Sequence, residues 1–147
     1  MGIRPIAICL IVHEQKILVF EGSYPEENRL FYRPLGGGID MGERAIETAV
    51  REFREEIGAE LCNVSYIKTI ENIFEHHGEM GHEIVFLMGA DLVDQSLYEQ
   101  DEIQAHEDDG SPFIAKWMQI EPFLRGEKVL YPLELVTYLE ENRAVWA

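Results

Sequence analysis

Basic residues are few in this chain, and their shortage limits what it can bind. The 147 residues include 12 Lys and Arg against 28 Asp and Glu, which gives a formal net charge of −16. Nucleic acids and anionic membrane surfaces are bound through cationic patches, so the composition argues against both as partners. A polyphosphate substrate would also be repelled unless metal ions and a few local basic groups intervened.

Cysteines and long apolar runs are scarce as well. The two cysteines, Cys9 and Cys62, cannot build a disulfide framework in a chain of this length, and their apolar contexts predict buried thiols in a reducing compartment. No apolar stretch approaches transmembrane length. The run 6–12 follows a single arginine and a proline and precedes no cleavage site, so it predicts a core strand rather than a signal peptide. We therefore expect a cytoplasmic protein.

The order of the predicted elements indicates one α/β domain over residues 1–147. No internal repeat and no linker interrupts the chain, and its length suits a single domain. Apolar and β-branched runs predict strands at 6–12, 16–20, 30–33, 61–74, 83–90 and 113–120. Helical spacing predicts helices at 43–57 and 132–142, a helical turn at 121–124, and one or two helical turns within 97–107.

A glycine loop followed by an amphipathic helix is the most informative stretch. Residues 36–59 read GGGIDMGERAIETAVREFREEIGA. Glycines let the backbone approach a ligand closely, and Glu43 places a carboxylate at the positive end of the helix dipole. Gly58 is a suitable C-cap. The apolar residues at helical spacing predict a core-facing stripe of Ile46, Ala49, Val50, Phe53 and Ile57.

Three glutamates flank that stripe. Glu52, Glu55 and Glu56 share an arc roughly 100° wide, because an α-helix turns by about 100° per residue. Carboxylates this close repel one another unless a cation lies among them, and oxygen ligands suit Mg²⁺ or Mn²⁺. The alternative is a solvated face on which Arg51 pairs with Glu47 and Glu55 at i,i+4 spacing.

The loop and helix together resemble the signature box of the Nudix hydrolases. Gly37, Glu43 and the run 51–59 (REFREEIGA) fill the charged and glycine positions of that pattern. Ala59 stands where a larger aliphatic residue is usual, and Leu35 adds one position to the family's Pro-Gly-Gly approach. The resemblance implies an α/β/α sandwich, with a mixed and mostly antiparallel sheet between helices.

The resemblance also implies metal-dependent hydrolysis of a nucleoside diphosphate linked to another moiety (NDP-X to NMP plus P-X). Glu52, Glu55 and Glu56 would hold Mg²⁺ or Mn²⁺, with the Gly36 carbonyl as an additional ligand. The family often adds a carboxylate from a loop before a late Trp-containing strand. Trp117 resembles that strand, so Glu107 is the predicted residue.

Catalytic and substrate roles follow from the same resemblance. Glu52, Glu55 or Glu107 would accept the proton of the attacking water, and the sequence leaves open which one does. Arg51 and Glu43 are expected to form a supporting pair that fixes the loop to the helix. The predicted substrate-binding residues are Arg33, whose planar fork suits phosphate, Gly37 in the loop, and His77 in a hairpin tip that is otherwise a plain exposed turn.

Two other functions stay open on the sequence. One is a house-cleaning nucleoside triphosphate pyrophosphatase, and the other is a non-catalytic Nudix-fold binding or regulatory module. The intact carboxylates and the single-domain length disfavour the module. Many Nudix proteins are homodimers, and the sequence does not decide this point. The expected partner is a small nucleotide derivative, with no nucleic acid and no membrane.

Overall fold

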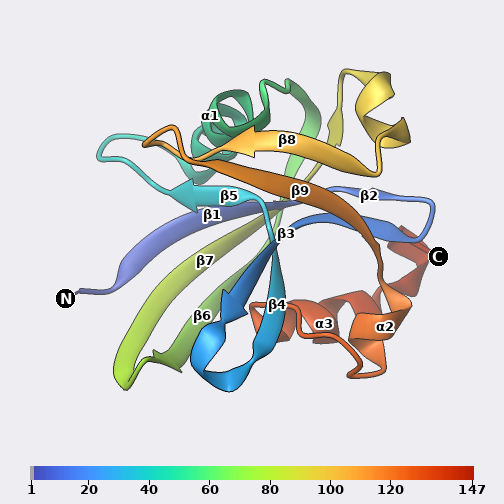
Figure 1. The fold of residues 1–147 in the computed structure, drawn as a ribbon. Helices are drawn as coiled ribbons and strands as arrows, with labels where there is room; N and C mark the ends of the chain where they lie inside the picture. The colour runs from blue at the N-terminus through green and yellow to red at the C-terminus, as the bar shows by residue number, and fades with distance from the viewer. Residues whose placement is uncertain (1) are drawn as a thin grey trace.

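Two curled β-sheets lie between helices in the computed structural model, which describes residues 2–147 and every side chain among them except those of Pro25 and His76 (Figure 1). The first sheet has the order β5 (Gly36–Gly38), β1 (Arg4–Leu10), β7 (Glu79–Leu92) and β6 (Leu61–His76). The second has β2 (Val12–His13), β3 (Lys16–Tyr24), β9 (Pro112–Gln119) and β8 (Glu102–His106), and β4 (Arg29–Pro34) also pairs with β3.

Helices cover both sides of these strands. Figure 1 shows α1 (Ala45–Ile57) on one side, with α2 (Glu121–Leu124) and α3 (Leu133–Glu141) on the other. Short 3₁₀ segments occupy Pro25–Glu27, Gln95–Glu99 and Arg143–Val145. The α/β class and the helix–sheet–helix layering are as predicted, although the strands divide into two sheets rather than one. None of the helices in residues 2–147 has the length and apolar character needed to cross a bilayer.

Residues 6–10 of strand β1 are apolar because both faces of this part of the strand are buried. Ile6, Ile8 and Leu10 pack into the core on the α3 side, with Leu135 and Leu139. The alternate residues Cys9 and Ile11 pack into the core on the α1 side, which contains Ala49 and Phe53. Cys9 and Cys62 are both free thiols, the first buried and the second partly buried. Two opposed cores therefore fix the layers on either side of β1.

The pairing of β1 places the glycine loop beside the first helix. β1 runs parallel to β7 and antiparallel to β5, with Ile8 opposite Gly36. A Cβ atom added at Gly36 would lie 2.1 Å from the carbonyl oxygen of Ala7, so only glycine fits at this position. Cys9 also donates its backbone N–H to the Leu35 carbonyl at 3.0 Å. The loop is thus attached to the centre of the sheet.

Two of the local predictions need correction. The helical turns predicted within 97–107 are confirmed only at their start, where the 3₁₀ segment Gln95–Glu99 ends, and the later residues form strand β8, in which only Ile103 and Ala105 are buried. This alternation is the two-residue period of a half-buried strand. Ile46 is 42% exposed rather than in the core. The buried stripe of α1 is instead rotated toward the glutamates and consists of Thr48, Ala49, Glu52, Phe53 and Glu56.

Element boundaries also differ from the prediction. α1 begins at Ala45 instead of Glu43, while Gly58 takes the left-handed C-cap conformation as expected, with φ of 65°. The β6–β7 hairpin is longer than predicted, and its turn is formed by His77 and Gly78, both with positive φ. Lengthening these strands brings His77 close to the segment Pro25–Glu27, as described below.

Candidate functional site

Two of the three predicted metal-binding glutamates are buried against the glycine loop. Glu52 is 4% exposed and Glu56 is 7% exposed, although both are acidic side chains. A Cβ atom at Gly37 would lie 2.5 Å from the carboxyl carbon of Glu52. Glycine at this position therefore leaves the space that the Glu52 carboxylate occupies. Glu55, one turn along the helix from Glu52, is exposed.

Arg51 joins the loop to the helix. Its Nε donates to Glu43 Oε2 at 2.7 Å and its Nη2 to Glu43 Oε1 at 3.0 Å, so the expected supporting pair is present. Nη2 also donates to the Gly38 carbonyl at 3.1 Å. Hydrogen bonds from Arg51 and from the Thr48 hydroxyl lower the pKa of Glu43 to about 2. These contacts hold the loop in one position over the first two turns of α1.

The remaining donors of Arg51 are directed at the glutamates. Its Nη1 donates to Glu52 Oε1 at 3.0 Å and to Glu55 Oε2 at 3.2 Å. The predicted i,i+4 pair with Glu47 is not formed, because Glu47 Oε1 accepts the Arg44 backbone N–H at 2.8 Å. The alternative of a solvated, salt-bridged face thus describes Glu55 in part, but not the buried Glu52 and Glu56.

Glu56 has a carboxylate oxygen that the described part of the protein leaves without a hydrogen bond. Its Oε1 atom is buried and has no hydrogen-bond partner within the part of the chain that the structure describes. Burial, followed by repulsion from Glu52 and Glu107, raises the pKa of Glu56 to about 9. Burial and the charge of Asp108 likewise raise the pKa of Glu52. A buried carboxylate without a donor is the expected partner for a cation.

A further acidic residue comes from the turn between β8 and β9. Carboxylate oxygens of Glu52, Glu55 and Asp108 lie within 4.8 Å of one another. Glu107, the residue chosen from the sequence, lines the same cavity, and burial raises its pKa. Sequence reasoning missed Asp108, because Glu107 and Asp108 are both acidic residues of one turn. Only the conformation of the turn decides which carboxylate points toward Glu52 and Glu55.

These residues line two hollows, which share several of their lining residues. The inner acidic cavity, of about 280 Å³, is lined by Gly36, Gly37, Glu52, Glu56, Glu107 and Asp108, together with Arg4 and Arg33. The outer acidic cavity, of about 560 Å³, is lined by Arg4, Gly38, Asp40, Arg51, Glu52, Glu55, Glu107 and Asp108. The donor set is carboxylate oxygen with backbone carbonyls nearby, which fits a hard divalent cation such as Mg²⁺ or Mn²⁺.

Arg33 stands between the acidic cavities and a third one. Its Nη2 donates to Glu83 Oε1 at 2.9 Å, and Glu83 is 5% exposed. Asn72 donates to the same oxygen at 3.4 Å. Arg33 lines both the inner acidic cavity and the aromatic cavity described next. Its charge is therefore partly compensated, and its side chain is 22% exposed.

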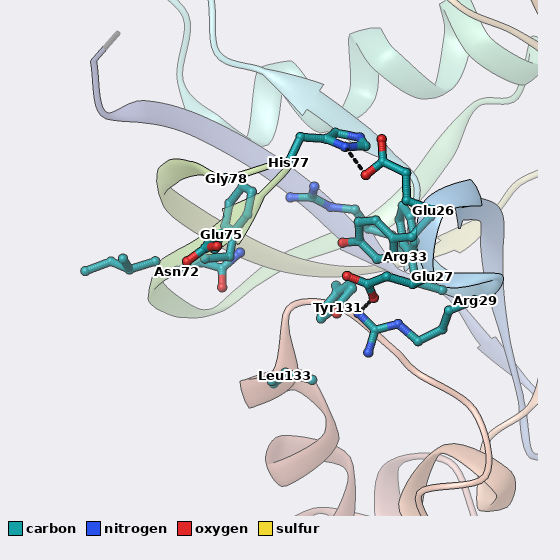
Figure 2. A pocket seen from close by; sticks show the side chains of 14 residues that line it. Glu26, Glu27, Arg29, Arg33, Asn72, Glu75, His77, Gly78, Tyr131 and Leu133 are labelled. Atoms are coloured by element: carbon teal, nitrogen blue, oxygen red, sulfur yellow. Dashed lines mark hydrogen bonds and ion pairs between the residues drawn. The ribbon is translucent and has the colours of Figure 1, made fainter.

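The aromatic cavity, of about 600 Å³, is assembled from three separate segments of the chain. Figure 2 shows its wall formed by residues of the segment 26–33, by the end of β6 with the β6–β7 turn, and by Tyr131 together with Leu133, the first residue of α3. The Phe31 ring lies 4.8 Å from that of Tyr24 and 5.5 Å from that of Tyr131. His77 Nδ1 lies 3.0 Å from Glu26 Oε2 across the rim. The structure thus places the predicted His77 on this wall, together with aromatic residues that sequence reasoning missed.

Comparison with known proteins agrees with the resemblance of the box. The model of the NUDIX domain matches residues 2–137. The chain belongs to the Nudix family. Its fold is shared by the solution structure of the E. coli ORF135 protein, with a TM-score of 0.62 and 22% identity over 99% of this chain and 94% of that one. A NUDIX hydrolase from Nitrosomonas europaea has a TM-score of 0.65 and 15% identity, covering 97% of this Nudix chain and 90% of its own.

Curated relatives match a shorter part of this Nudix chain. The NAD-capped RNA hydrolase NudC of Pseudomonas aeruginosa, from strains LESB58 and PAO1, is 29% identical over 102 residues, which is 69% of this chain. The matched part is 34% of the NudC sequence, so this chain spans about a third of the length of these relatives. The family match and these relatives support the prediction of a Nudix-type pyrophosphohydrolase.

Proposed function

We propose that this protein is a divalent-metal-dependent pyrophosphohydrolase that splits a nucleoside diphosphate derivative, NDP-X, into NMP and P-X. One observation carries the proposal. Among the described residues, Glu56 has a buried carboxylate oxygen without a partner, and it lines one cavity with Glu52 and the glycine loop of the Nudix box. Such an arrangement costs stability in the isolated protein, and a bound divalent cation would compensate for it.

The residues that would hold the metal come from three segments. Glu52, Glu55 and Glu56 from α1 and Asp108 from the β8–β9 turn supply carboxylates, and the Gly36 carbonyl and Glu107 are further candidate ligands. Mg²⁺ or Mn²⁺ bound there would neutralise charge on the phosphate oxygens and lower the pKa of a bound water.

The protein's own side chains would position and deprotonate the reactants. Arg51 and Glu43 fix the loop, so that Gly37 and Gly38 present backbone to the phosphates. A carboxylate oxygen of Glu52, Glu55 or Glu107 would accept the proton of the attacking water. Glu52 and Glu55 belong to the carboxylate cluster with Asp108, and Glu107 lines the adjoining cavity, so all three stay candidates.

The aromatic cavity supports the nucleoside part of the proposed substrate. Tyr24, Phe31 and Tyr131 supply ring surface for a base, and Arg33 lies where the phosphates would pass toward the acidic cavities. His77 on the rim is the proposed polar contact. NAD, named in the NudC relatives, contains two nucleosides joined by one pyrophosphate and so falls within the NDP-X class. The net charge of −16 still disfavours RNA itself as a partner.

A substrate panel tests the proposal. Purified protein would be incubated with nucleotide sugars, ADP-ribose, NAD, dinucleoside polyphosphates and nucleoside triphosphates, in Mg²⁺, in Mn²⁺ and in EDTA. We expect metal-dependent release of NMP from one or more NDP-X compounds. Faster release of pyrophosphate from triphosphates would instead identify the house-cleaning alternative. Absence of turnover by the wild type with every substrate and metal would favour the binding module.

Location and assembly also belong to the proposal. We propose a cytoplasmic enzyme that acts on a small nucleotide derivative and binds neither nucleic acid nor membrane, on the grounds of its composition. Whether it forms a homodimer is a matter for light scattering in solution.

A further inference from the structure

Arg4 is a cation without a protein partner beside the acidic cluster. Within residues 2–147 its guanidinium makes no hydrogen bond or ion pair, whereas Arg33 and Arg51 are both bonded to carboxylates. Arg4 nevertheless lines both the inner and the outer acidic cavity. Its five N–H donors are therefore available to a ligand, in a region where every other lining charge of the outer cavity except that of Arg51 is negative.

Arg4 lies at the start of β1, with its side chain beside Gly38. A Cβ atom added at Gly38 would lie 3.4 Å from Arg4 Nη2, so the guanidinium rests against the glycine loop. Arg51 donates to the carbonyl oxygen of the same glycine at 3.1 Å. Two guanidinium groups thus flank Gly38, and only that of Arg4 retains its full set of donors.

The shared lining residues put the three cavities in the order aromatic, inner acidic, outer acidic, so the site has a nucleoside side and an opposite side. Arg33 lines the aromatic and the inner acidic cavities, and Arg4 lines the inner and the outer acidic cavities. A substrate with its base in the aromatic cavity would pass its phosphates by Arg33 and the carboxylates, and its far end would reach Arg4. The outer cavity is lined by charged residues and Gly38, without an apolar side chain.

We propose that Arg4 binds the phosphate of the P-X portion, on the side of the scissile bond away from the nucleoside, and that the outer acidic cavity accepts a hydrophilic X group. This inference rests on the proposed pyrophosphohydrolase function. A charge-assisted hydrogen bond from a guanidinium to phosphate favours binding of the P-X half, and Arg33 serves the nucleoside half. The charged lining of the outer cavity disfavours an apolar X group.

Binding of the two products separates the roles of the arginines. The substrate that the wild type hydrolyses fastest in the panel is chosen, and its two products are titrated separately by calorimetry onto Mg²⁺-loaded protein. If that substrate is ADP-ribose, for example, the two products are AMP and ribose 5-phosphate. We expect Arg4→Ala to weaken binding of P-X about tenfold or more, while binding of NMP stays unchanged. We expect Arg4→Lys, which keeps the charge but not the fork, to recover part of the loss.

Arg44→Ala is the matched control. Arg44 is also an exposed arginine near the loop, but it lines none of the three cavities. We expect this variant to bind both products as the wild type does, and KM for the whole substrate to rise only in the Arg4 variants. Exposure of Arg4 makes a folding defect unexpected, and thermal unfolding checks this.

Other outcomes would overturn the inference. Equal weakening of both products, together with tighter Mn²⁺ binding by Arg4→Ala, would show that Arg4 only offsets the acidic charge. Unchanged binding in Arg4→Ala would show that it has no role in binding. In both cases the wild type still hydrolyses its substrate, so the proposed function survives. Failure of the wild type to hydrolyse any compound would remove the proposed function, and this inference with it.

Discussion

The acidic and aromatic cavities differ in how the chain builds them. Most acidic ligands come from one helix and the loop before it, within residues 36–56, whereas the aromatic cavity collects side chains from residues 24–33, 72–78, 131 and 133. The acidic cavity contains buried carboxylates that repel one another, and the aromatic cavity contains rings that pack favourably. The proposed chemistry thus depends on a local motif, while the proposed recognition of the nucleoside depends on distant segments.

The largest expected effect is that of removing the charge of Glu56. Glu56→Gln should lower metal-dependent turnover about a hundredfold or more, because the unpartnered buried oxygen is the proposed metal ligand. Steady-state kinetics in Mg²⁺ measures the change, and circular dichroism verifies the fold. Glu141→Gln, which removes an exposed glutamate from α3, is the control and should be fully active. Full activity of Glu56→Gln would contradict the proposal that the acidic cavity carries out the chemistry and the aromatic cavity the recognition.

The second prediction concerns the stability of the metal-free protein. The pKa of Glu56 is raised from 4.5 to about 9, so above pH 5 the folded protein keeps a proton that the unfolded chain has lost. Stability should therefore fall as the pH rises from about 5 toward 9, by up to about 1.4 kcal/mol per pH unit from this residue. Urea unfolding in EDTA at pH 5, 6, 7 and 8 measures the slope. An equal slope in Glu56→Gln would contradict this account.

The third prediction distinguishes the two acids of the β8–β9 turn. Asp108→Asn should weaken Mn²⁺ binding about tenfold to a hundredfold, because its carboxylate lies with those of Glu52 and Glu55. Glu107→Gln, which removes a charge from the same cavity, should have a smaller effect. Titration followed by electron paramagnetic resonance gives both affinities. A larger loss of Mn²⁺ affinity in Glu107→Gln than in Asp108→Asn would instead identify Glu107 as the main ligand from this turn.

The smallest effect is expected in the aromatic cavity. Tyr24→Leu removes a ring that lies 4.8 Å from Phe31, and should raise KM about threefold to tenfold with little change in kcat. Tyr66→Leu is the control, because Tyr66 is 54% exposed and lines none of the three cavities. If Tyr24→Leu lowered kcat as strongly as Glu56→Gln does, the division between chemistry and recognition would be wrong.

Sequence reasoning succeeded best where the structure is local. The end of α1 at Gly58, the pair of Arg51 with Glu43, and the placement of Glu52 and Glu56 beside an apolar face follow from helical spacing and glycine chemistry. It failed at Ile46, because the helix buries its glutamates and turns that residue outward. It also failed at β8, where acidic composition obscured the alternation of Ile103 and Ala105.

The sequence by itself determined the Nudix family, the α/β class and the glycine loop with its acidic helix, because these depend on residues close together in the chain. Only the tertiary structure decided that Asp108 joins Glu52 and Glu55, that Arg4 lies beside Gly38, and which rings meet around the third cavity. The reason is sheet register, since pairing between strands far apart in sequence sets which side chains share a face.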